Sequence, residues 1–148
     1  MSSRDIELYI VDILIAIDKI SRYIHNTNNA SEFVCNEIIW DATVRELEVI
    51  GEATKYLLNA NLLEQSYRRV VDFRNQITHG YFGIDENIVW DVVINKLPQY
   101  KNDLLATVQE CGINLQQAIL TAKKDYQTHS EVVHFLDQLS LLPNYKRI

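Results

Sequence analysis

Apolar residues recur every three or four positions along most of the chain, which is the spacing that places them on one face of an α-helix. The most regular run falls in residues 4–25. Its members are Ile6, Ile10, Ile13, Ile17, Ile20 and Ile24. A face this regular predicts a long helix that packs tightly, either within a helical bundle or across a dimer interface.

A second long helix is predicted over residues 37–58. Its inner face is formed by Ile39, Thr43, Leu47, Ile50, Thr54 and Leu57. Gly51 lies beside this face, although a glycine inside a helix costs about 1 kcal/mol relative to alanine. We therefore expect another helix to approach closely at Gly51. The neighbouring Glu52 is interpreted as a surface carboxylate, with an ion pair to the motif described below as the alternative.

Shorter amphipathic segments complete the pattern. They cover residues 31–35, 64–78, 85–95, 98–112 and two stretches within 113–148. Trp90, Val93 and Ile94 are expected to be buried, and Pro98 is expected in the first turn of a new helix, where its missing N–H costs nothing.

Breaking residues are scarce, since the 148 residues include only 4 Gly and 2 Pro. The chain is therefore predicted to be all-α. We expect an antiparallel bundle of four to five core helices in residues 1–112. Residues 113–148 are predicted to form a C-terminal helical extension packed on the same domain.

The net charge of −6 argues against broad binding of nucleic acid. The charge is uneven, however. Residues 31–54 carry six carboxylates against Arg45, whereas residues 65–79 carry Arg68, Arg69 and Arg74 against Asp72. A small basic site on an acidic body suits binding of one RNA region, with Arg68 and Arg69 as substrate-binding residues, or a basic partner elsewhere. An acidic face that is merely solvated is the plainer interpretation.

Several classes of protein are disfavoured. Cys35 and Cys111 form neither a metal-binding spacing nor a disulfide framework, so we expect buried free thiols in a reducing cytosol. His129 and His134 are too isolated to be metal ligands. No apolar run approaches the length of a membrane span, and the N-terminus lacks a signal-peptide layout. The sequence predicts a cytoplasmic protein with no metal site and no cofactor.

The stretch from Val71 to Tyr81 carries the candidate chemistry, because it holds Arg74, His79 and Tyr81 at Arg-x4-His-x-Tyr spacing. Arg74 falls in the middle of a mainly apolar stripe. The stripe is formed by Tyr67, Val70, Val71, Ile77 and Thr78. A guanidinium stays charged, so Arg74 needs either a structural ion pair or an anionic ligand such as phosphate.

His79 lies roughly 140° around an ideal helix from Arg74, so the two residues do not share a face. Gly80 allows the helix to end there. His79 can then turn toward Arg74 or meet an Arg74 from a second subunit, or it serves only as a helix cap.

These residues suit cleavage of RNA, which carries its own nucleophile in the 2′-hydroxyl. His79 can exchange protons near neutral pH, Arg74 can bind the phosphate through two N–H groups, and Asn75 can orient either partner.

The motif Arg74-Asn75-x3-His79 resembles the signature of the HEPN superfamily of all-helical RNases, and its extension to Tyr81 resembles the HepT-like branch. Other fragments agree with that branch over about residues 4–112. They are Ile50-Gly51-Glu52-Ala53, Phe82-Gly83 and Leu97-Pro98. The resemblance implies a HEPN-type helical bundle and a homodimer in which two motif helices form a composite cleft. It also implies RNA cleavage without a metal ion.

The HepT-like branch further implies a toxin of a type VII toxin–antitoxin pair. Its partner would be a nucleotidyltransferase antitoxin of the MntA type, which transfers AMP from ATP to the motif tyrosine, here Tyr81. Transfer RNA is the substrate class associated with this branch. Two alternatives stay open: a non-catalytic HEPN module that binds a nucleotide or a partner, and a plain helical adaptor in which Arg74 makes a structural ion pair.

Overall fold

The computed structural model describes residues 5–79 and 83–142, and across these two ranges it consists of helices joined by turns, without strands. The elements are α1 (Ile6–Tyr23), α2 (Ala30–Cys35), α3 (Glu37–Asn59), the 3-10 turn η1 (Gln65–Tyr67), α4 (Arg68–His79), α5 (Glu86–Asp91), the π-helical turn η3 (Val92–Lys96), α6 (Leu97–Glu110), α7 (Gln116–Asp125) and α8 (Ser130–Ser140). The predicted all-α helical bundle is confirmed.

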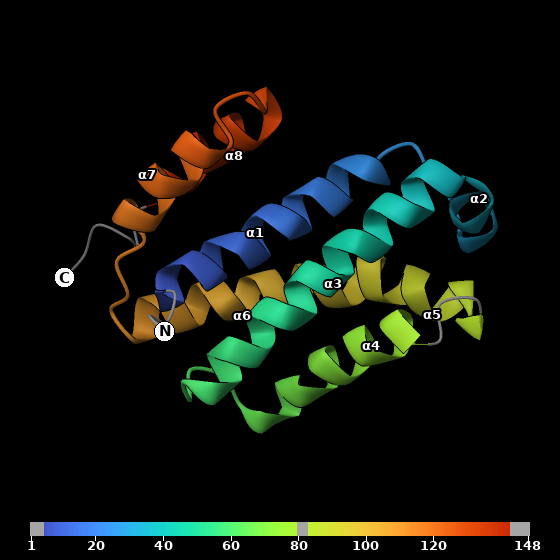
Figure 1. Cartoon of the computed structure of the whole chain (residues 1–148), viewed down its shortest axis with the longest axis horizontal. Helices are drawn as coiled ribbons and strands as arrows, with labels where there is room; N and C mark the ends of the chain where they lie inside the picture. The colour runs from blue at the N-terminus through green and yellow to red at the C-terminus, as the bar shows by residue number, and fades with distance from the viewer. Residues whose placement is uncertain (1–4, 80–82, 143–148) are drawn as a thin grey trace.

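Helix α1 lies at the centre, because it contacts α3, α6, α7 and α8 (Figure 1). The isoleucine face is therefore used inside one chain: Ile6 is half-buried, and the other five members are buried. Of the two possibilities that the pattern left open, the structure supports the bundle core. This face is not available to a second subunit.

Helices α1, α3 and α4 lie side by side in that order, with α6 behind them (Figure 1). Helix α3 runs antiparallel to α1, since Tyr9 near the start of α1 stacks on Tyr56 near the end of α3, and Lys19 pairs with Glu46 at 4.0 Å. Burial raises the pKa of the Glu46 carboxyl, against the opposing effect of Lys19.

The C-terminal helices α7 and α8 form a hairpin against α1 on the side away from α3 (Figure 1). An ion pair of 2.6 Å between Lys123 and Asp137 joins them. Their apolar faces are buried, as their spacing predicts, through Leu115, Ile119, Leu136 and Leu139 among others. The division of the chain into units 1–112 and 113–148 stays a prediction.

The predicted break before Pro98 is absent, because α5, η3 and α6 form one uninterrupted helix. The π-helical turn Val92–Lys96 ends two residues before Pro98, which lies in the first turn of α6. A π-turn carries an extra residue and shifts the faces of a helix. This shift explains why Val93 is buried as expected but Ile94 is 42% exposed, contrary to the prediction.

Both cysteines are exposed, so the prediction of buried thiols is wrong. Cys35 is the last residue of α2, and Cys111 follows the end of α6. Both cysteines thus lie at helix ends, where their side chains face outward. Within the described residues, no helix is long and apolar enough to cross a lipid bilayer.

Candidate functional site

Helix α4 carries Arg74, Asn75 and His79 and is called the motif helix below; its start is bonded to α6. The Tyr67 hydroxyl donates a hydrogen bond to Asp103 Oδ2, and the Tyr67 ring packs against Tyr100 with ring centres 5.0 Å apart. The Tyr100 hydroxyl lies 2.8 Å from Thr54 Oγ1 on α3. Burial raises the pKa of the Tyr67 hydroxyl, and the hydrogen bond to Asp103 raises it further. Burial also raises the pKa of Tyr100 to about 12. The motif helix therefore begins at a defined position.

Arg74 crosses α3 at Gly51. A Cβ atom at position 51 would lie 2.2 Å from Arg74 Cβ and 2.5 Å from Arg74 Cγ, far inside van der Waals contact. The stem of Arg74 thus occupies the space that only a glycine leaves open. This confirms the predicted close approach at Gly51, and it explains why a glycine is tolerated inside a long helix.

The guanidinium of Arg74 emerges beside Glu52 and Asn75. Arg74 Nη2 lies 3.5 Å from Glu52 Oε2, and Arg74 Nη1 donates to Asn75 Oδ1 at 3.0 Å. Within the described part of the chain, Arg74 Nε is buried without a hydrogen-bond partner. The side chain keeps 32% of its surface exposed. Arg74 therefore combines the structural ion pair with a partly exposed guanidinium that an anionic ligand can reach.

The predicted apolar stripe around Arg74 is narrower than expected. Val71 and Ile77 are buried, Tyr67 and Val70 are half-buried, and Thr78 is exposed. Glu52, interpreted from the sequence as a surface carboxylate, is 45% exposed and also forms the alternative ion pair. Its position next to Gly51 is the sequence signal for this contact. Asp103 carried no such signal, because its partner Tyr67 was assigned only to the apolar stripe.

His79 is the last residue of α4 and is exposed. Across the described residues, no hydrogen bond or ion pair links it to Arg74. Among the described residues of one chain, Arg74 is hydrogen-bonded to Asn75, and His79 is bonded to neither of them. Tyr81 lies outside the described residues.

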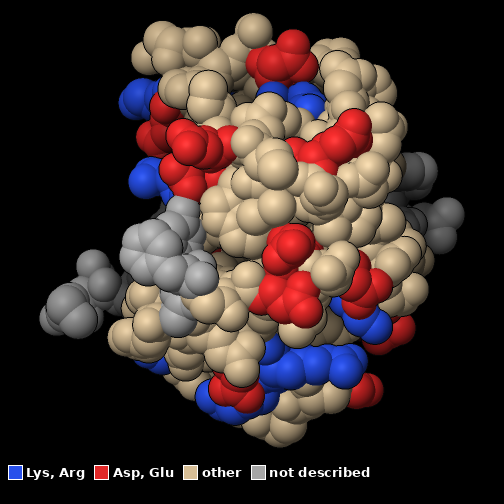
Figure 2. Space-filling model, turned by 90° about the vertical axis from the view of Figure 1, so that its right-hand side faces the viewer, with Lys and Arg blue, Asp and Glu red and all other residues tan. Residues whose placement is uncertain are grey.

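Arg68 and Arg69 are both exposed at the first turn of α4. Figure 2 shows a band of Lys and Arg side chains near the lower edge of one face, with Asp and Glu side chains above it. The basic band lies toward the level at which Figure 1 shows α4. The basic band is adjacent to acidic side chains, and some Asp or Glu side chains also lie beside and below it.

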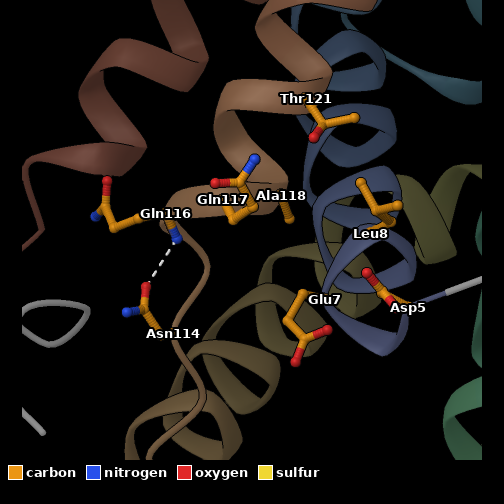
Figure 3. A pocket seen from close by; sticks show the side chains of 8 residues that line it. All are labelled: Asp5, Glu7, Leu8, Asn114, Gln116, Gln117, Ala118 and Thr121. Carbon is orange, nitrogen blue, oxygen red and sulfur yellow. Dashed lines mark hydrogen bonds between the residues drawn. The ribbon is translucent and has the colours of Figure 1, made fainter.

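A hollow of about 430 Å³ opens between the starts of α1 and α7, away from the motif (Figure 3). It is lined by Asp5, Glu7, Leu8, Asn114, Gln116, Gln117, Ala118 and Thr121. Asn114 Oδ1 accepts a hydrogen bond from the Gln116 backbone N–H at 2.9 Å, which closes a turn just before α7. No motif residue lies here. Among the described residues, no group of three or more His, Cys, Asp and Glu side chains is arranged to hold a metal ion.

Comparison with known proteins covers the motif and most of the bundle. A family model described as "Ribonuclease HepT-like" matches residues 13–107. The chain is 32% identical over 107 residues to "Putative RNase MJ1380" of Methanocaldococcus jannaschii, an alignment that spans 70% of this chain and 97% of that protein. It is 31% identical over 96 residues to "Probable ribonuclease HepT" of Thermococcus cleftensis, spanning 63% of this chain and 86% of that protein. No solved structure matches the chain.

Proposed function

The chain belongs to the HepT-like ribonuclease family, as its motif predicts, and on this premise we propose that it is an RNA endonuclease that works without a metal ion. One observation carries the proposal: the stem of Arg74 is fixed over Gly51, and its guanidinium stays partly exposed. An arginine in this state is prepared to bind a phosphate, because little side-chain freedom remains to be lost.

In the proposed reaction the RNA 2′-oxygen attacks the adjacent phosphorus. A base takes the proton of the 2′-hydroxyl, and an acid protonates the leaving 5′-oxygen, which yields a 2′,3′-cyclic phosphate. His79 serves as base or acid near neutral pH. The Arg74 guanidinium stabilises the charge that develops on the phosphate oxygens, and Asn75 holds its Nη1 group in place.

We propose a homodimer with a composite cleft. Arg74 reaches Glu52 on α3, whereas His79 is the last residue of α4 and is exposed. A second subunit that presents its own motif helix would place one chain's His79 near the other chain's Arg74. Sedimentation at micromolar concentration should then show a dimer. A strict monomer that cleaves RNA would rule out this arrangement.

The proposed biological role is that of a toxin in a type VII toxin–antitoxin pair that acts on transfer RNA. The antitoxin would be an MntA-type nucleotidyltransferase that attaches AMP to Tyr81, two residues beyond His79. The adenylate phosphate would compete for Arg74, and the adenosine would fill the space that RNA needs. The family membership and the motif spacing support this role.

The Arg74–Glu52 ion pair favours one other candidate, a helical adaptor in which Arg74 is structural. The two functions differ in what purified protein does to RNA. The nuclease should cleave transfer RNA in excess EDTA and leave a 2′,3′-cyclic phosphate, detected by mass spectrometry of the fragments. Cleavage that requires Mg²⁺ would overturn the metal-free mechanism, and no cleavage of any RNA would favour the adaptor.

Regulation is tested separately with the cognate nucleotidyltransferase, ATP and Mg²⁺. The wild type should gain the mass of at least one AMP and lose its nuclease activity. The Tyr81→Phe variant should gain none and continue to cleave RNA. Adenylate mass on Tyr81→Phe would remove Tyr81 as the modified residue.

A further inference from the structure

A stacked pair of tyrosines lies close to the Arg74 site. The rings of Tyr9 on α1 and Tyr56 on α3 are parallel within 7°, with centres 4.4 Å apart. Tyr9 is packed against the core, whereas Tyr56 is 40% exposed. Tyr56 follows Glu52 by four residues on α3, so the two side chains lie on the same face one helical turn apart.

A shallow hollow lies beside Tyr9 and Glu52, which adjoin Tyr56 and Arg74 respectively. It measures about 330 Å³ and is lined by Tyr9, Asp12, Arg45, Glu48, Val49, Glu52 and Ala53. Tyr9 is the inner ring of the pair, and Glu52 is the ion-pair partner of Arg74. A phosphate held by Arg74 would therefore lie next to Glu52, and Tyr9 lines the same hollow.

The charge of the hollow favours a base over a phosphate. Among its described lining residues, three carboxylates, from Asp12, Glu48 and Glu52, stand against the single guanidinium of Arg45. A phosphodiester would be repelled there. A nucleobase is uncharged, has a flat π-face that stacks on tyrosine, and carries polar edges that exchange hydrogen bonds with carboxylate and guanidinium groups.

We infer that Tyr9 and Tyr56 form a nucleobase-stacking subsite, which takes the base next to the phosphate held by Arg74. Tyr9 supports the ring of Tyr56 from within the bundle, and the exposed part of Tyr56 receives the base. The inference rests on the proposed function and adds a substrate-binding role for two residues outside the motif.

Binding of oligonucleotides that cannot be cleaved tests this subsite independently of catalysis. One probe is a short 2′-O-methyl RNA of mixed sequence, and the other is an abasic sugar–phosphate oligomer of equal length. Tyr56→Leu in the full chain should weaken binding of the first probe about tenfold, because stacking on one aromatic ring is lost. It should leave binding of the abasic probe unchanged. Tyr56→Phe should lose less affinity than Tyr56→Leu.

Leu120→Ala is the matched control, since Leu120 is 58% exposed on α7, away from α3 and α4 (Figure 1). It should change neither affinity. Equal weakening of both probes by Tyr56→Leu, no weakening of either, or no binding of the base-containing probe to wild type would overturn the inference. A smaller sedimentation coefficient for Tyr56→Leu would also overturn it, because Tyr56 would then belong to a protein interface.

The same variants separate this inference from the proposed function. RNA cleavage with a Michaelis constant that Tyr56→Leu does not raise would sink the subsite and leave the nuclease standing. Base-dependent binding through Tyr56 without any cleavage would leave the subsite standing and sink the nuclease.

Discussion

The two ends of α4 are held in opposite ways. At its beginning, Tyr67 joins η1 to α6 through Asp103, and further along Arg74 is locked over Gly51 and paired with Glu52. At its end, His79 is exposed. The arginine therefore has its position set by the fold of one chain. In the proposed reaction, His79 would depend on something beyond that fold, either RNA or a second subunit, to reach the phosphate.

The largest expected effect concerns activity. Arg74→Ala and His79→Ala should each reduce RNA cleavage by at least about 100-fold, as expected for loss of charge stabilisation or of proton transfer. Thermal unfolding should separate the two variants. His79→Ala should melt like the wild type, while Arg74→Ala should melt at a lower temperature, because its packed stem is lost. Equal melting temperatures for all three proteins would contradict the conclusion that Arg74 is packed into the fold whereas His79 is not.

The contact at Gly51 should dominate stability. Gly51→Ala should lower the free energy of unfolding by about 2 kcal/mol. The added methyl would overlap with the stem of Arg74, and this overlap costs more free energy than alanine gains in helix propensity. Urea unfolding followed by circular dichroism measures the change. Gly83→Ala is the matched control, since a Cβ there has no neighbour within 4 Å. If Gly51→Ala is as stable as Gly83→Ala, α3 and α4 are not tightly packed at Gly51.

Loss of the Tyr67 hydroxyl should have a smaller effect. Tyr67→Phe should cost about 1 kcal/mol at neutral pH, the usual net value of a hydrogen bond. The pKa of Tyr67 is raised in the folded protein from its ordinary 10.0, so the unfolded state loses its proton first. The difference in the free energy of unfolding between wild type and Tyr67→Phe should therefore be fully present below pH 10.0 and decrease as the pH rises above it. Unfolding of both proteins across this range decides the matter, and a gap that widens would contradict the assignment.

The smallest effect is expected at the Glu52 carboxylate. Glu52→Gln should change the free energy of unfolding by less than about 0.5 kcal/mol, because the pair with Arg74 is solvent-exposed. Asp137→Asn, which weakens the exposed pair with Lys123, provides a comparison of the same kind. A loss several times larger at Glu52 would show that Arg74 depends on this carboxylate more than its exposure suggests.

Sequence periodicity predicted the helices except for the break before Pro98, which the structure lacks. The close approach at Gly51 followed from a glycine placed beside the apolar face of a helix. Periodicity could not say which neighbour covers a face, and so the isoleucines of α1 remained compatible with either a core or an interface. It could not decide whether Arg74 makes a structural ion pair or binds a ligand, because the exposure of the Arg74 guanidinium depends on how α3 packs against α4. The exposure of the two thiols was not predicted, because both cysteines lie at helix ends, and the exact end of a helix is the least certain feature of a sequence-based prediction.

The π-helical turn Val92–Lys96 has a consequence for how this chain tolerates change in length. In an α-helix each residue advances the direction of the side chains by about 100°, so one extra residue sets the rotational phase of everything beyond it. Upstream of the turn, α5 packs on α2; downstream, α6 packs on α1. The two halves are thus out of phase by the surplus residue. Deleting a single residue from this turn would restore a regular helix and turn one half away from its neighbour, whereas the same deletion in an exposed loop would be absorbed.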